Sequence, residues 1–147
     1  YEITYGDWSS DVCSSDLYCR RARINNYMKI APILAFQNQL KVFHWQTFSY
    51  SEHKALGKAY EILDELFDRF VETYYGKYGK TPIETNYNIV IESYGNERDV
   101  KKTISNQKRD LIGYIRSQLS ETDMDLKNIT DEIEGEINHL QYLLDLK

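Results

Sequence analysis

Apolar residues recur at helical spacing in four stretches of the chain, namely residues 30–46, 52–75, 99–119 and 124–146. Apolar side chains that return every third or fourth residue are typical of amphipathic helices. The pattern therefore predicts an all-α protein with four helices. The core positions it predicts are Ile30, Ile33, Leu34, Leu40 and Phe43; Leu56, Tyr60, Leu63, Phe67, Phe70 and Tyr74; Val100, Ile104, Leu111, Ile115 and Leu119; and Ile129, Ile133, Ile137, Leu140 and Leu144.

The connections between these stretches differ greatly in length. Residues 47–51 form a short link with Ser51 as a candidate N-cap, and residues 120–123 form another, so each link predicts an antiparallel helix pair. Residues 80–97 are longer and interrupt the helical period, which predicts a crossover that lets the second and third helices run parallel. Within it, residues 87–94 fit a short strand or a short helix. The helix is preferred because a lone strand has nothing to pair with.

Composition and charge narrow the class of protein. With 147 residues and 41% hydrophobic residues, the chain is long enough for one globular domain. We expect a soluble, cytoplasmic protein, because no apolar run is long enough for a membrane span and no signal peptide opens the chain. The net charge of −5 argues against more than weak DNA binding. The only cluster that resembles a basic arm is Arg20, Arg21 and Arg23.

The N-terminal segment differs in character from the rest. Residues 7–17 resemble the conceptual translation of a sequencing adapter, and a Ser- and Asp-rich disordered tail is the alternative. We therefore divide the chain into a disordered or artefactual segment, 1–27, and a helical domain, 28–147, with Met28 as a candidate start. Both cysteines, Cys13 and Cys19, fall in the first segment, so the domain has no disulfide and no thiolate ligand.

Four potential metal ligands lie in and before the second predicted helix. His44 and His53 flank the first short link, and Asp68 and Glu72 are four residues apart near the other end of the helix. His53 and Asp68 would be about 22 Å apart along one helix, so a single metal ion cannot bind both within one chain. Two copies packed antiparallel about a two-fold axis would bring the histidines of one against the carboxylates of the other. Such a site would be shared between subunits and would suit iron or zinc.

This arrangement resembles the Dps proteins, the miniature ferritins that oxidise and store iron in twelve-subunit shells. The resemblance is close over residues 34–79 and looser from residue 109 onward. It implies a ferritin-like four-helix bundle with a long crossover between helices 2 and 3, and a ferroxidase site between subunits. The matching ligands are His44, His53, Asp68 and Glu72. The family usually has an Asp where this chain has Gly57, and the loss of that carboxylate shifts the preference toward a metal such as Zn²⁺.

The same resemblance carries further expectations. Fe²⁺ would be oxidised by dioxygen or peroxide and the ferric product stored as mineral, with Trp45 and Tyr60 near enough to intercept radical by-products. The protein would be a homodimer that builds a larger shell. The chain also resembles, less closely, uncharacterised ferritin-like proteins of tailed bacteriophages.

Two alternatives compete with this interpretation. Glu136 and His139 have the E-x-x-H spacing by which di-iron bundles hold metals in their core, but the other helices lack the matching ligands, which favours a surface pair. The other alternative is a metal-free, dimerising helical bundle that acts as a structural or interaction protein. A rise of the melting temperature with Fe²⁺ would separate it from an iron-binding protein.

Overall fold

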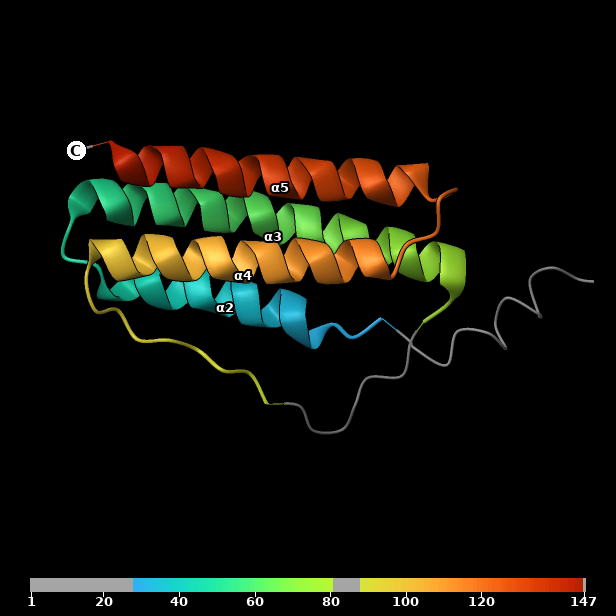
Figure 1. Cartoon of the computed structure of the whole chain (residues 1–147), viewed down its shortest axis with the longest axis horizontal. Helices are drawn as coiled ribbons and strands as arrows, with labels where there is room; N and C mark the ends of the chain where they lie inside the picture. Colours follow the sequence, from blue (N-terminus) through green and yellow to red (C-terminus); the bar gives the residue numbers. More distant parts are fainter. Residues whose placement is uncertain (1–27, 81–87, 147) are drawn as a thin grey trace, which may run out of the picture.

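The computed structural model describes residues 28–80 and 88–146, and within them the chain is helical, with no strand. Four helices form the body of the protein: α2 (Ala31–Gln46), α3 (Tyr50–Tyr78), α4 (Glu97–Ser117) and α5 (Met124–Asp145) (Figure 1). The predicted all-α class and the four predicted helices are confirmed. The segment 1–27, with both cysteines and the arginine cluster, lies outside the described residues. None of the described helices is long and apolar enough to cross a membrane.

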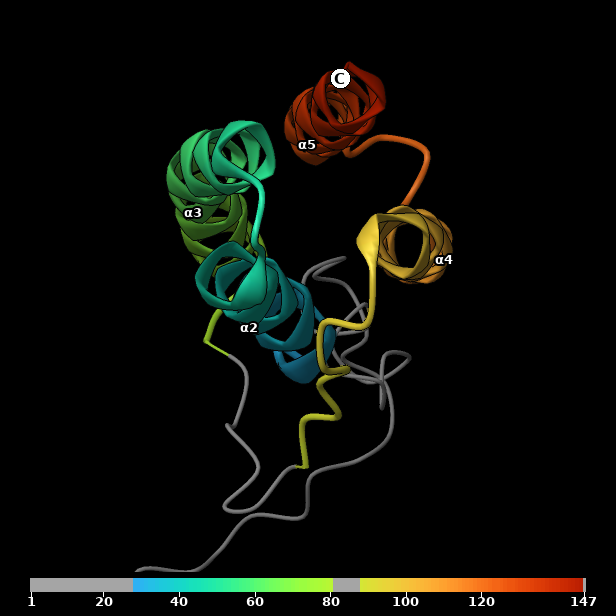
Figure 2. The ribbon, with the colours of Figure 1, turned by 90° about the vertical axis from the view of Figure 1, so that its left-hand side faces the viewer.

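The four helices pack as two antiparallel pairs. Helix α3 contacts α2 and α5, and α4 contacts α5 and α2, so that each helix has two neighbours around a common core (Figure 2). Helices α3 and α4 run in the same direction (Figure 1), so the connection between them joins opposite ends of the bundle. The long connection after the first pair therefore acts as the predicted crossover.

The first pair contributes both aromatic and aliphatic residues to the core, and the second pair contributes aliphatic residues. Phe36, Phe43, Phe67 and Phe70 are fully buried and belong to α2 and α3. Tyr60 was predicted in the core but lies at its edge, where its hydroxyl accepts a hydrogen bond from the Lys41 ammonium at 3.3 Å. The other predicted core positions that remain partly exposed are Ile30, Leu34 and Leu119.

A buried glutamate fixes the turn between α2 and α3. The N-cap of α3 is Ser49, two residues before the predicted cap, and its hydroxyl accepts the backbone N–H of Glu52. Glu52 is 7% exposed, and its carboxylate accepts hydrogen bonds from the Thr47 hydroxyl at 2.6 Å and the Tyr94 hydroxyl at 3.1 Å. Because buried carboxylates need such partners, Glu52 holds the turn and the crossover together.

The described part of the crossover, residues 88–96, contains neither helix nor strand. The preferred short helix is therefore wrong for residues 88–94, and residues 81–87 lie outside the described part of the chain. The physical reason is that side chains of α2 bind this backbone directly. The Gln39 amide, fully buried, donates to the Glu92 carbonyl at 2.8 Å and accepts from the Glu92 N–H at 2.7 Å. The Gln46 side chain accepts the Tyr94 N–H at 2.7 Å.

A buried aspartate ties the end of α3 to the turn before α5. Burial alone would raise the pKa of Asp123, but hydrogen bonds from Lys77, Tyr78 and the Ser120 N–H outweigh it and hold the pKa at about 2. The Lys77 ammonium lies 2.7 Å from the Asp123 carboxylate. In the unfolded chain the pKa returns to its ordinary value of 3.8. The ionised carboxylate therefore stabilises the fold above about pH 4, and this contribution is lost as the pH falls toward 2.

Asp123→Ala is expected to lower the free energy of unfolding by about 2 kcal/mol at pH 7, because Tyr78 and Lys77 lose their buried acceptor. Urea unfolding of both proteins between pH 7 and pH 2 measures the difference, which should shrink below pH 4. A difference that stays constant down to pH 2 would contradict this role of the carboxylate.

Candidate metal site

The two predicted histidine ligands lie against each other at one end of the α2–α3 pair. Their rings are stacked, with centroids 3.8 Å apart and planes inclined by 21°. The Nδ1 atom of His44 lies 2.9 Å from the carbonyl oxygen of His53, and the Nδ1 atom of His53 lies 2.9 Å from the carbonyl oxygen of His44. Each histidine thus binds the backbone of the other, and the short turn between α2 and α3 makes this reciprocal contact possible.

These contacts decide which nitrogen of each ring carries the proton. A carbonyl oxygen only accepts hydrogen bonds, so Nδ1 must be protonated in both rings. In the neutral imidazole, Nε2 is then the nitrogen with the lone pair. Histidine ligands of metals commonly donate their other ring N–H to a backbone carbonyl or a carboxylate, which fixes the tautomer and the ring orientation. His44 and His53 have this arrangement within a single chain.

Gly57 leaves the space that the His44 ring occupies. A Cβ atom at position 57 would lie 2.9 Å from Cε1 and 3.1 Å from Nδ1 of His44. Both distances are shorter than ordinary van der Waals contacts, so any larger residue would push the ring away from its stacked position. The histidine stack therefore requires glycine at position 57 and is incompatible with a carboxylate side chain there. A chain with Asp there would need a different position for His44.

Gly57→Ala is accordingly expected to displace the His44 ring and break the stack. The change should alter the NMR shifts of the His44 and His53 rings. Gly113→Ala is the matched control, because a Cβ atom there meets nothing within 4 Å in α4. That control should gain about 0.5–1 kcal/mol from helix propensity and leave the histidine signals unchanged. Unchanged histidine signals in Gly57→Ala would refute the steric coupling.

The two predicted carboxylate ligands lie far from the histidines of the same chain. Asp68 and Glu72 are exposed one turn apart on α3, and His53 belongs to the same helix, which runs without interruption from Tyr50 to Tyr78. The separation of about 22 Å between His53 and Asp68 follows from this continuous helix. Among the described residues of one chain, no three His, Cys, Asp or Glu side chains come together as a metal site.

Lys41 lies beside two aromatic residues, Trp45 of α2 and Tyr60 of α3, a contact that was not predicted from the sequence. Its ammonium lies 5.6 Å from the ring centroid of Trp45 and 5.0 Å from that of Tyr60. Both distances are within the range of cation–π contacts. The only signal in the sequence is the helical spacing of residues 41 and 45. The two residues expected to intercept radicals are therefore brought together around one cation.

The E-x-x-H pair of α5 lies at the surface. His139 is exposed, and its Nδ1 atom is 3.6 Å from the partly buried Glu136 carboxylate. The neighbouring Ile137 and Leu140 occupy the core instead and are fully buried. This agrees with the surface pair that the sequence analysis favoured over a di-iron site in the bundle core.

Comparison with known proteins gives a family but no activity. A family of unknown function (DUF5856) matches residues 44–144, a range that contains all four candidate ligands, His44, His53, Asp68 and Glu72. No match was found among curated proteins or among solved structures. Since the match covers more than half of the chain, the protein belongs to the family of unknown function DUF5856.

Proposed function

We propose that the protein is a ferritin-like protein that binds and oxidises Fe²⁺ at a site shared between two copies of the chain. His44 and His53 of one copy and Asp68 and Glu72 of the other are its ligands. The observation that carries the proposal is the stacked histidine pair, because each ring binds a backbone carbonyl through Nδ1 and directs its metal-binding capacity to Nε2.

The topology supports the same proposal. An antiparallel helix pair, a long crossover and a second antiparallel pair, with α3 parallel to α4, is the arrangement of ferritin-like bundles. The continuous α3 keeps the histidines and carboxylates of one chain apart. Two copies related by a two-fold axis across this helix would bring them together.

The ligand set fits a divalent cation. Two neutral imidazoles and two carboxylates would neutralise the charge of one Fe²⁺ ion. Each Fe²⁺ would give up one electron, so that four Fe²⁺ ions with four protons would reduce one dioxygen to two water molecules, and two Fe²⁺ ions with two protons would reduce one hydrogen peroxide to two water molecules. The ferric product would be stored as mineral. Without a carboxylate at Gly57, the same four groups also suit tetrahedral Zn²⁺. Zinc is therefore the redox-inert competitor that the site should admit.

Thermal unfolding with and without metal tests the proposal. Anaerobic Fe²⁺ at about 100 times its dissociation constant should stabilise the folded protein by about 2.7 kcal/mol, and Zn²⁺ should act similarly. The variant His44→Ala/His53→Ala should lose the response. If neither ion shifts the melting temperature of the wild-type protein, the iron site is wrong. The protein would then be the metal-free helical bundle with a structural or interaction role.

A further inference from the structure

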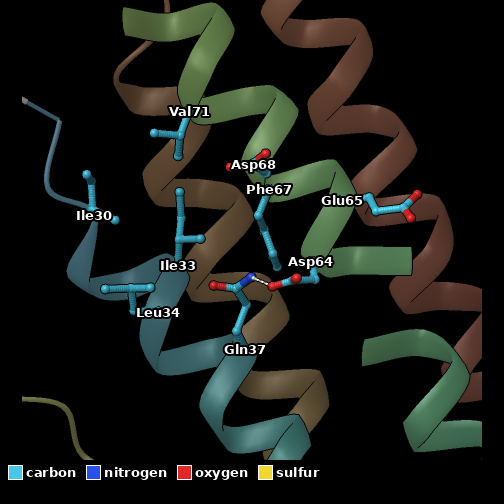
Figure 3. Close-up of a pocket in the computed structure, with 9 residues that line it drawn as sticks. All are labelled: Ile30, Ile33, Leu34, Gln37, Asp64, Glu65, Phe67, Asp68 and Val71. Atoms are coloured by element: carbon cyan, nitrogen blue, oxygen red, sulfur yellow. Dashed lines mark hydrogen bonds between the residues drawn. The ribbon is translucent and has the colours of Figure 1, made fainter. Parts of the chain in front are cut away.

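A hollow of about 520 Å³ opens between α2 and α3 on the outside of the bundle. Its apolar lining comes from both helices and consists of the partly exposed Leu34 and Val71 beside the buried Ile33 and Phe67 (Figure 3). Asp64 and the candidate ligand Asp68 also line it. The Gln37 side chain donates to the Asp64 carboxylate at 2.8 Å and bridges the two helices at this level. The hollow is thus an apolar depression beside carboxylates, which suits an aromatic group that carries or accompanies positive charge.

Such a group is exposed at the opposite end of the same helix pair. Trp45 is 67% exposed, and the Lys41 ammonium lies over its ring. Two further aromatic residues of the turn, Phe48 and Tyr50, are also exposed, with fractions of 97% and 75%. Exposed aromatic residues gathered at one place are typical of protein interfaces, and tryptophan is the residue most enriched among their strongest contacts.

The charges along α3 indicate what covers this surface. Its first half carries the exposed Lys54 and Lys58 beside His53, together with the exposed Glu61. Its second half carries four exposed acidic residues, Asp64, Glu65, Asp68 and Glu72, together with Arg69, whose guanidinium is paired with Glu132 of α5. An antiparallel second copy would place the basic half of one α3 against the acidic half of the other. Such charge complementarity selects an antiparallel pairing over a parallel one.

The proposed metal site fixes the register of that pairing. If His53 meets Asp68 and Glu72 of the other copy, the two-fold axis passes near the middle of α3. The level of residues 64–71, which carries the hollow, then faces the level of residues 51–58 in the second copy. Because His44 contacts His53 and Gly57, Trp45 belongs to this same level. The symmetry therefore brings an exposed indole of each copy to the hollow of the other.

We propose that Trp45 of one copy docks into the α2–α3 hollow of a second copy, with Lys41 beside the acidic rim. This inference rests on the proposed function for its register, but the contact itself needs no metal. It makes the dimer a consequence of an aromatic anchor on each chain. Asp68 lines the hollow and is also a proposed ligand, so the docked indole of the partner would lie beside the metal site and shield one side of it from solvent.

Sedimentation of the full chain in EDTA tests this docking. The wild-type protein should dimerise without metal, and Trp45→Ala should weaken the dimer by about 30-fold. Leu34→Glu places a charge in the hollow of each copy and should weaken the dimer by a similar factor. Tyr142→Ala removes an aromatic side chain that is 61% exposed on α5 and is the matched control, with no expected effect. Circular dichroism confirms that each variant is folded.

The outcomes separate this inference from the proposed function. A metal-free dimer that depends on Trp45 but shows no metal response supports the docking and refutes the iron site. A metal response in a protein whose association is unaffected by both Trp45→Ala and Leu34→Glu refutes the docking. A wild-type chain that stays monomeric at all concentrations also overturns the docking.

Discussion

The double variant His44→Ala/Asp68→Asn is expected to lose rapid oxidation of Fe²⁺, with a fall in rate of more than about 100-fold. Each proposed site would keep only His53 from one copy and Glu72 from the other, which leaves the ion with too few ligands and too little negative charge. Stopped-flow absorbance of the ferric product under air measures the rate. His44 and Asp68 are not part of the buried core, so the helix content should not change.

A matched control for this experiment is present in α5. Glu136→Gln/His139→Ala removes another carboxylate and another imidazole, from a surface pair that we place outside the site. This variant should oxidise Fe²⁺ at the wild-type rate. Equal rates in the wild-type protein and in His44→Ala/Asp68→Asn would show that the four proposed ligands do not take part in Fe²⁺ oxidation.

Gln39→Ala is expected to lower the free energy of unfolding by about 2–3 kcal/mol. The Gln39 side chain satisfies both the N–H and the carbonyl of Glu92, and each hydrogen bond lost costs about 0.5–1.5 kcal/mol. The crossover should also become more mobile, so the Glu92 amide should exchange with solvent faster. Urea unfolding and amide hydrogen exchange measure the two effects.

The neighbouring Asn38 provides the control for Gln39. Asn38 is exposed, and its amide donates to the Leu34 carbonyl within α2 at 2.7 Å. Asn38→Ala should therefore change the stability by less than about 0.5 kcal/mol. A loss for Gln39→Ala no larger than that for Asn38→Ala would show that the crossover does not depend on this clamp.

The sequence predicted the helices well because each carries a regular apolar stripe. Ile129, Ile133, Ile137, Leu140 and Leu144 occupy the core of α5 as the period requires. The same apolar period led to the prediction that Tyr60 lies in the core. Periodicity does not show that a neighbouring lysine holds the tyrosine hydroxyl at the edge.

The crossover was harder to predict because its conformation depends on distant residues. Gln39 lies in the polar part of the α2 pattern, and the sequence gives no sign that it is buried against Glu92, 53 positions later. A single sequence gives no direct information on such long-range contacts. The local preference for a short helix at residues 88–94 was therefore overridden by tertiary hydrogen bonds.

Candidate ligands could be named from the sequence, but their geometry could not. The spacing of His53 and Asp68 along one helix was enough to separate them, and the continuous α3 agrees. The ring stack and the role of Gly57 required coordinates, because both depend on a contact between two helices. The His44 ring can occupy its observed position because residue 57 is a glycine and carries no side chain.

Complementation between two inactive variants tests the shared site most directly. His44→Ala/His53→Ala and Asp68→Asn/Glu72→Gln should each be inactive alone. In a mixed dimer, the intact histidines and the intact carboxylates meet at one of the two sites, so random reassortment restores about one quarter of the wild-type sites. Recovery of Fe²⁺ oxidation to about that level after unfolding and refolding together would support the account. A mixture as inactive as its components would contradict a site shared between subunits.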